Sequence, residues 1–198
     1  REATVRAPGA MAAVLGLERD ELAALCADVS ASTGQPLVIA NDNCPGQLVI
    51  SGDRLAVEQA IPLAETKGAK RVVPLAVSVA SHSPLMAKAS EGMAALLDRV
   101  KVKDPIRPLV GNVNASLLRT GAEVCQELKE QLTHGVQWQK TIERMRDEGA
   151  DMFLEVGPGS VLTKLVRRID YSVNSVAISD DYEGMLSERW ALVEAAAR

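Results

Sequence analysis

Short apolar runs alternate, over the first 77 residues, with stretches in which apolar residues recur every three or four positions. Runs of the first kind predict strands, and the helical spacing predicts amphipathic helices. The Asn43-Cys44-Pro45-Gly46 sequence is typical of a turn and predicts a hairpin. The order strand-helix-strand-strand-helix-strand predicts a ferredoxin-like small subdomain over residues 9–77. The predicted strands are residues 10–15, 37–41, 47–52 and 71–77, and the predicted helices are residues 18–29 and 54–66.

Residues 78–198 carry a different pattern, in which helices alternate with single strands. This alternation predicts a parallel α/β layer. Because a small parallel sheet with an exposed edge makes a poor domain, we expect this part to be the C-terminal portion of a larger domain. Residues 1–8 would then be a linker from its missing N-terminal part. The predicted helices are residues 84–100, 121–132, 136–148 and a short helix after the 157–160 turn; the strands are 108–113, 152–156 and 175–179, before a polar tail.

His82 lies where the apolar run 77–80 ends, and Pro84 follows it as the first residue of a predicted helix. In α/β proteins the carboxyl ends of strands face the ligand crevice. An imidazole there can act as a general acid and base near neutral pH. The alternative is a half-buried imidazole that caps the helix. That helix is expected to bury Met86, Ala89, Met93, Leu96 or Leu97, and Val100.

The composition excludes some classes of function. Aromatic residues make up 3% of the chain and the net charge is −4, which argues against a binder of nucleic acid. The three cysteines have no metal-ligand spacing, so we expect reduced thiols, no metal and a cytoplasmic protein. The apolar runs are shorter than a membrane span, and the first residues lack the shape of a signal peptide. A start without Met suggests a trimmed chain or a piece of a longer polypeptide.

A set of sequence stretches resembles the malonyl-CoA:acyl carrier protein transacylase family. Their order and spacing fit as a set, from near the first residue to about residue 180. The stretches are GAMAAVLGL (9–17), NDNCPGQLVISG (41–52), SVASHSPLM (78–86), QLTHGVQW (131–138) and FLEVGPG (153–159). The resemblance implies an α/β-hydrolase-like large domain with an inserted ferredoxin-like subdomain.

The resemblance also implies a ping-pong transfer in fatty-acid synthesis. A serine takes malonyl from coenzyme A and passes it to the phosphopantetheine thiol of acyl carrier protein. Malonyl-CoA and the carrier protein are then substrates and partners, no cofactor is implied, and no membrane or nucleic acid is involved. The family's serine lies in a G-H-S-x-G elbow, and neither that motif nor the family's P-G-Q-G loop and carboxylate-binding arginine is found in this sequence. We therefore expect an S-malonyltransferase as the full-length protein, and this chain alone to be inactive.

The resemblance assigns roles to individual residues. His82 matches the general base, and Gln131 matches a position whose carbonyl accepts a hydrogen bond from that imidazole and so fixes its tautomer. Asn41 and Asn43 match residues near the pantetheine arm, whose amides need both donors and acceptors; ordinary turn chemistry is the alternative for both. Ser81 matches a position that helps to set the tolerated α-substituent. Because Ser81 is small, the choice between malonyl and methylmalonyl stays open, with malonyl favoured.

Two other functions fit the same residues. The chain could be a catalytically incomplete fragment that only binds carrier protein or coenzyme A. It could also be an acyltransferase domain excised from a polyketide synthase. For Gln131, the alternative interpretation is a solvent-exposed residue at the end of a helix, without a role in the site.

Overall fold

The computed structural model describes residues 9–178. The predicted linker 1–8, the last residue of the final predicted strand and the polar tail lie outside the described residues. The chain divides into two compact units, of which the first ends at Met145 and the second begins at Arg146.

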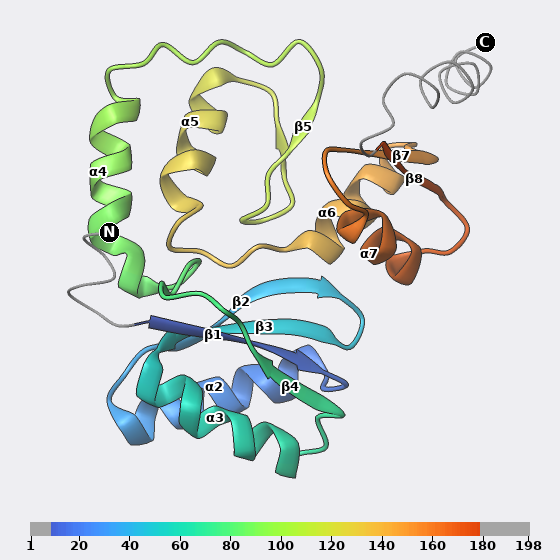
Figure 1. The fold of residues 1–198 in the computed structure, drawn as a ribbon. Helices are drawn as coiled ribbons and strands as arrows, with labels where there is room; N and C mark the ends of the chain where they lie inside the picture. The colour runs from blue at the N-terminus through green and yellow to red at the C-terminus, as the bar shows by residue number, and fades with distance from the viewer. Residues whose placement is uncertain (1–8, 179–198) are drawn as a thin grey trace. The chain divides into compact units, whose positions relative to one another are not determined.

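The first unit begins with a four-stranded antiparallel sheet in the order β2-β3-β1-β4 (Figure 1). The two helices that connect the strands of this sheet lie on the same face of it (Figure 1). The elements run in the order strand-helix-strand-strand-helix-strand. They are β1 (Gly9–Leu15), α2 (Arg19–Thr33), β2 (Leu37–Cys44), β3 (Gln47–Asp53), α3 (Arg54–Thr66) and β4 (Arg71–Pro74).

The core of this region lies between the sheet and its two helices. Alternate residues of the strands and one face of each helix point into it, as the periods of two and 3.6 residues require. Val14 and Ile50 of the sheet and Leu22 of α2 are fully buried there. Each buried aliphatic side chain of this size contributes roughly 1.5–3 kcal/mol of transfer free energy. The Asp53 carboxylate caps α3 by accepting a hydrogen bond of 2.8 Å from the Leu55 amide.

The edge of this sheet that β2 forms is partly covered by a later segment of the same unit. The Asp42 amide donates to the Val136 carbonyl and the Val136 amide donates to the Ala40 carbonyl, each at 2.8 Å. This short parallel bridge joins β2 to the residues just before α6 (Trp138–Asp147). Covering an edge strand in this way removes unpaired backbone groups, and it attaches the chain after α5 to the sheet.

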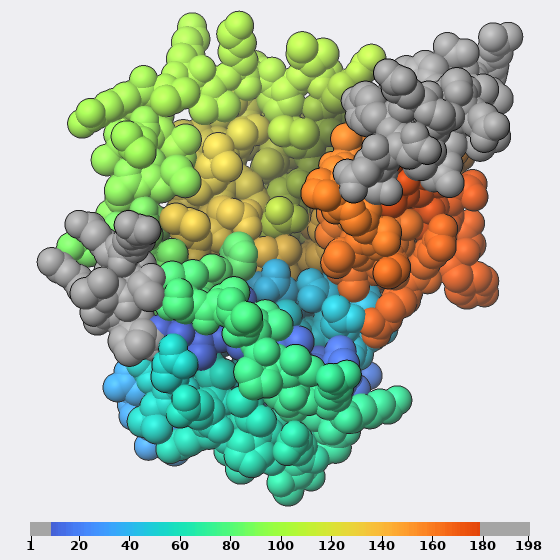
Figure 2. Space-filling view, in the orientation of Figure 1, coloured from blue at the N-terminus to red at the C-terminus, as the bar shows by residue number. Residues whose placement is uncertain are grey.

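The predicted helix over residues 84–100 is shorter in the structure and its face is not buried. A 3₁₀ turn, η1 (Pro84–Met86), precedes α4 (Ala87–Leu97), and the described chain buries no side chain of either. Met93, Leu96 and Val100 are exposed. Their spacing is helical as predicted, but they remain exposed instead of entering a core. Figure 2 shows the following segment, residues 98–108 in light green, at the surface of the first unit, with Ile106 95% exposed.

The predicted strand over 108–113 is also wrong in length and in partner. It reduces to β5 (Leu109–Val110), which pairs antiparallel with β6 (Leu117–Leu118), a strand that the pattern did not predict. The chain reverses between them because the Gly111 amide donates to the Ser116 carbonyl at 2.9 Å. After this hairpin comes α5 (Gly121–Glu130), with a capping box between Thr120 and Glu123. The three-stranded parallel layer predicted for the second half is therefore not what the described residues form.

The second unit contains a parallel strand pair, β7 (Met152–Val156) and β8 (Asn174–Ile178), joined through α7 (Val161–Ile169). The Glu155 carboxylate accepts hydrogen bonds from the first turn of α7, 3.0 Å from the Leu162 amide and 2.7 Å from the Thr163 amide. A carboxylate at a helix N-terminus satisfies amides that have no partner within the helix. The Glu155 contact thus fixes how α7 follows β7 in this unit.

Candidate active site

His82 lies in a tight turn and not at the end of a strand. β4 ends at Pro74, so the prediction that a strand runs directly into the histidine is wrong. The apolar residues 77–80 form a loop that leads to the turn. The backbone of His82 is left-handed, with φ of 59°. Residues other than glycine adopt this region at a cost, and such outliers cluster at functional sites.

The imidazole of His82 is held by the backbone at the end of α5. Its Nδ1 atom is 2.8 Å from the carbonyl oxygen of Gln131, and the ring is half-buried. A carbonyl only accepts, so Nδ1 carries the proton in this contact, and in the neutral ring the lone pair is then on Nε2; the tautomer is assigned from the hydrogen bond. Gln131 itself is held by its backbone amide, which donates to the Glu127 carbonyl at 2.9 Å. The ring can therefore take a proton at Nε2.

The packing of α4 against α5 brings these two residues to the same end of the helix pair. The two helices lie side by side in the first unit (Figure 1). The Ser90 hydroxyl on α4 donates to the Lys129 carbonyl near the end of α5 at 2.5 Å. His82 precedes α4 and Gln131 follows α5, and 49 positions separate them in sequence. No helical or strand period could predict this contact.

The other residues assigned from the sequence lie in two places. Ser81 is half-buried in the turn beside His82. Asn41 and Asn43 lie within β2, which extends to Cys44, and not in the turn that ordinary turn chemistry would suggest. Within residues 9–178 no hydrogen bond joins either asparagine side chain to His82 or Gln131. The structure thus brings Ser81, His82 and Gln131 together and leaves the asparagines on the neighbouring sheet.

A charged pair near the open edge of the sheet was not predicted. The Asp42 carboxylate lies 3.3 Å from the Arg19 guanidinium, and Asp42 is 8% exposed. Burial raises the pKa of Asp42, although the positive charges of Arg19 and Lys140 oppose that rise. The pair lines a pocket of about 330 Å³ in the first unit, together with residues of α6. Because its members are distant in sequence, no motif marked it.

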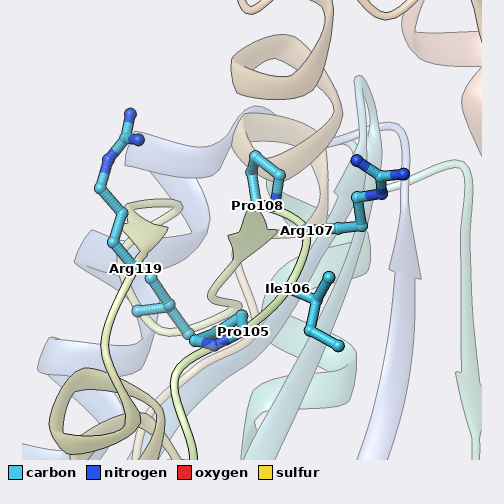
Figure 3. A pocket seen from close by; sticks show the side chains of 6 residues that line it. Pro105, Ile106, Arg107, Pro108 and Arg119 are labelled. Atoms are coloured by element: carbon cyan, nitrogen blue, oxygen red, sulfur yellow. The ribbon is translucent and has the colours of Figure 1, made fainter.

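A second pocket of about 200 Å³ lies beside the β5–β6 hairpin (Figure 3). Arg107 and Arg119 contribute to its wall, but their guanidinium groups extend from different sides and do not meet (Figure 3). An anion would need converging donors, so this arrangement does not form an anion site. Neither of these two pockets is lined by His82 or Gln131.

The cysteines offer no nucleophile for the imidazole. Cys26 and Cys44 are buried, Cys125 is half-buried, and none of these three forms a disulfide. Burial raises the pKa of the Cys26 thiol to about 12, which keeps it protonated. Among residues 9–178 there is no group of three or more His, Cys, Asp or Glu side chains placed to hold a metal ion. In the same part of the chain, every helix is too short or too polar to cross a bilayer.

The described residues thus hold, in an α/β chain, a histidine whose ring is oriented by a backbone carbonyl. Residues 2–180 match the family described as "Acyl transferase domain", and the chain belongs to this family. It is 40% identical over 179 residues to the malonyl CoA-acyl carrier protein transacylase of Bacillus subtilis (strain 168), covering 90% of this chain and 56% of that protein. It is 39% identical over 180 residues to the transacylase of that name from Escherichia coli (strain K12), covering 91% and 58%.

Solved structures agree with these sequence matches. FabD from Acinetobacter baumannii superposes with a TM-score of 0.90 at 35% identity, covering 98% of this chain and 62% of that one. A holo complex of a type II PKS acyl-carrier protein with its malonyl-transacylase (PlMCAT:AntF) gives 0.86 at 37% identity, covering 90% and 57%. The α/β fold is therefore similar to that of the matching part of these solved transacylases. The chain spans a little over half the length of the curated relatives it matches.

Proposed function

We propose that this chain is the histidine-bearing part of a malonyl-CoA:acyl carrier protein S-malonyltransferase. The enzyme would move a malonyl group from coenzyme A to the phosphopantetheine thiol of acyl carrier protein, in fatty-acid synthesis in the cytoplasm. The observation that carries the proposal is the 2.8 Å contact between His82 Nδ1 and the Gln131 carbonyl oxygen, in a chain of the acyl transferase domain family. The names of the relatives support the choice of acyl group and acceptor.

The proposal includes the architecture of the larger protein. Residues 9–77 form a ferredoxin-like subdomain inserted in an α/β-hydrolase-like domain. Residues 78–198 belong to the C-terminal part of that domain, and residues 1–8 are the linker. The antiparallel sheet order β2-β3-β1-β4 supports the assignment of the subdomain. The serine would come from polypeptide outside these 198 residues, because the sequence holds no G-H-S-x-G elbow. This chain alone is then inactive.

The proposed reaction has two matched halves. In the first, the serine hydroxyl attacks the thioester carbonyl of malonyl-CoA while Nε2 of His82 takes its proton. The C–S bond breaks, Nε2 gives the proton to the departing thiolate, and malonyl remains on the serine as an ester. In the second half, the phosphopantetheine thiol gives its proton to Nε2 and attacks the ester. The serine oxygen leaves and takes the proton back, so the enzyme ends as it began.

The remaining residues serve this cycle. The Gln131 carbonyl keeps the proton on Nδ1 and stabilises the imidazolium as it forms, the task of the carboxylate in a Ser-His-Asp triad. Asn41 and Asn43 bind the amides of the pantetheine arm. Ser81 lies beside the base and leaves room at the α-carbon, so that bulk at this position does not select malonyl over methylmalonyl. The cycle uses no metal and no cofactor beyond the two substrates.

The test uses the product of the whole gene. Incubation with malonyl-CoA should give a malonyl adduct by mass spectrometry, and addition of acyl carrier protein should discharge it. His82→Ala should lower turnover by roughly 10²–10⁴-fold, as expected for loss of a general base. His134→Ala is the matched control, because His134 is exposed and its Nδ1 contacts the Glu130 carbonyl at 3.1 Å. Near-normal turnover of the His82 variant would reject its role.

A binding module is the second candidate, favoured by the lack of a serine elbow in this sequence. In that case the 198-residue chain binds carrier protein or coenzyme A without chemistry. Titration with acyl carrier protein, followed by NMR, would show shifts at micromolar to millimolar concentrations, whereas the whole-gene product would form no adduct. Ketosynthase or carrier domains in the same reading frame would instead identify a polyketide-synthase acyltransferase domain.

A further inference from the structure

We propose that Ser83 is a positioning residue that holds His82 in its left-handed conformation and so aims the imidazole at Gln131. The catalytic consequence rests on the proposed function. The conformational claim does not, because it concerns only how this turn is built.

The Ser83 hydroxyl spans the histidine turn from both sides. Ser83 is fully buried, its Oγ atom donates to the Ala80 carbonyl at 2.7 Å, and the same oxygen accepts from the Leu85 amide at 3.3 Å. His82 lies between the two backbone groups that this hydroxyl joins. This buried hydroxyl uses its single donor and one of its two lone pairs in these contacts, so the loop from Ala80 to Leu85 closes around one side chain.

The conformation at His82 needs such a restraint. A left-handed backbone brings Cβ close to the following carbonyl oxygen, and residues other than glycine avoid it unless their surroundings impose it. The upstream end of the loop is fixed as well, because Ala80 packs on β1 so closely that a Cβ on Gly9 would lie 2.4 Å from the Ala80 nitrogen. Ala80 is fixed on the sheet and Leu85 lies in η1. The Ser83 hydroxyl, which joins the two, therefore determines the backbone path at His82.

A purely structural role makes a different prediction. If Ser83 only caps η1, its loss lowers stability but leaves the conformation and the ring of His82 unchanged. Ser30 provides the matched control. Its hydroxyl donates to the Leu37 carbonyl at 3.2 Å and accepts from the Leu37 amide at 3.0 Å, between α2 and β2. Ser30→Ala thus removes a comparable pair of hydrogen bonds without touching the histidine turn.

The conformational test is a cycle of four variants of the whole-gene product. Glycine is tolerant of left-handed φ and alanine is not. With Ser83 present, the His82→Gly variant should therefore have a higher urea midpoint than the His82→Ala variant. In the Ser83→Ala background that advantage should shrink or reverse, because the turn no longer has to be left-handed. An equal advantage in both backgrounds would overturn the proposal, since other contacts would then impose the conformation.

The second readout is the imidazole itself. Nitrogen-detected NMR of Ser83→Ala should show loss of the Nδ1–H tautomer at His82, and Ser83→Cys, which keeps a weak donor, should restore part of it. In the whole-gene product Ser83→Ala should lower kcat by about 10²-fold, as a displacement of about 1 Å can, with KM for malonyl-CoA little changed. Ser30→Ala should leave tautomer and kcat unchanged. A normal tautomer in a folded Ser83→Ala variant would refute the proposal; a lost tautomer with normal kcat would refute only the proposed function.

Discussion

Gly9→Ala should displace the histidine turn without touching the histidine. An added Cβ would lie 2.4 Å from the Ala80 nitrogen and 2.6 Å from the Ala80 Cβ, whereas ordinary contacts begin at 3.4 Å. Gly9 and Ala80 must therefore move apart by about 1 Å, from 2.4 Å to ordinary contact at 3.4 Å. Because His82 follows two residues later, much of that shift reaches the imidazole. A displacement of about 1 Å at a catalytic group costs about 10²-fold in rate.

The assay for Gly9→Ala is malonyl transfer by the whole-gene product, with stability followed in urea. Gly92→Ala is the control, because a Cβ there meets nothing within 4 Å and lies in α4. We expect kcat for Gly9→Ala to fall by about 10²-fold, and Gly92→Ala to keep full activity and gain up to about 1 kcal/mol in unfolding free energy. Full activity of a folded Gly9→Ala variant would refute the reasoning that β1 fixes the turn.

Four further changes test other parts of the structure. Burial raises the pKa of Glu155, but hydrogen bonds from α7 outweigh this effect and leave that pKa below its usual value. Glu155→Gln should therefore lower the free energy of unfolding by about 1 kcal/mol at pH 7. This difference should vanish as the pH falls through the pKa of Glu155 in the folded protein. Burial raises the pKa of Asp42, so its ionised form opposes folding. Asp42→Asn should therefore stabilise the folded protein at pH 7 and lose that advantage at acid pH. Destabilisation at pH 7 would show that the Arg19 ion pair dominates. Ile50→Ala, at a fully buried site, should cost about 3 kcal/mol in urea unfolding. Thr120→Ala should cost about 1 kcal/mol and increase amide exchange in the first turn of α5, where the Glu123 amide now bonds to Thr120.

The sequence was a good guide where local pattern and capping agreed. The helix predicted over 54–66 has those bounds in α3, because Asp53 supplies the cap and one apolar face packs on the sheet. Prediction was weaker where the partner of a segment decides its structure. Residues 77–80 have strand-like composition but form a loop, and residues 108–113 form only the short β5 because the chain reverses at Gly111.

The candidate site divides in the same way. His82 and Gln131 were paired by resemblance to a family, since nothing in the 49 positions between them signals contact. Ser83 carries no motif meaning of its own, and its importance appears only with the left-handed φ of its neighbour. The Asp42–Arg19 pair depends on the meeting of β2 with the start of α2, which the pattern could not specify.

The central claim is that the backbone at Gln131 holds the His82 ring with Nε2 ready to accept a proton. Nitrogen-detected NMR of the unmodified whole-gene product, with the ring neutral, tests this most directly. A ring that carries its proton on Nδ1 is the predicted result. A ring that carries it on Nε2 would contradict the account, because such an imidazole could not take a proton from a serine.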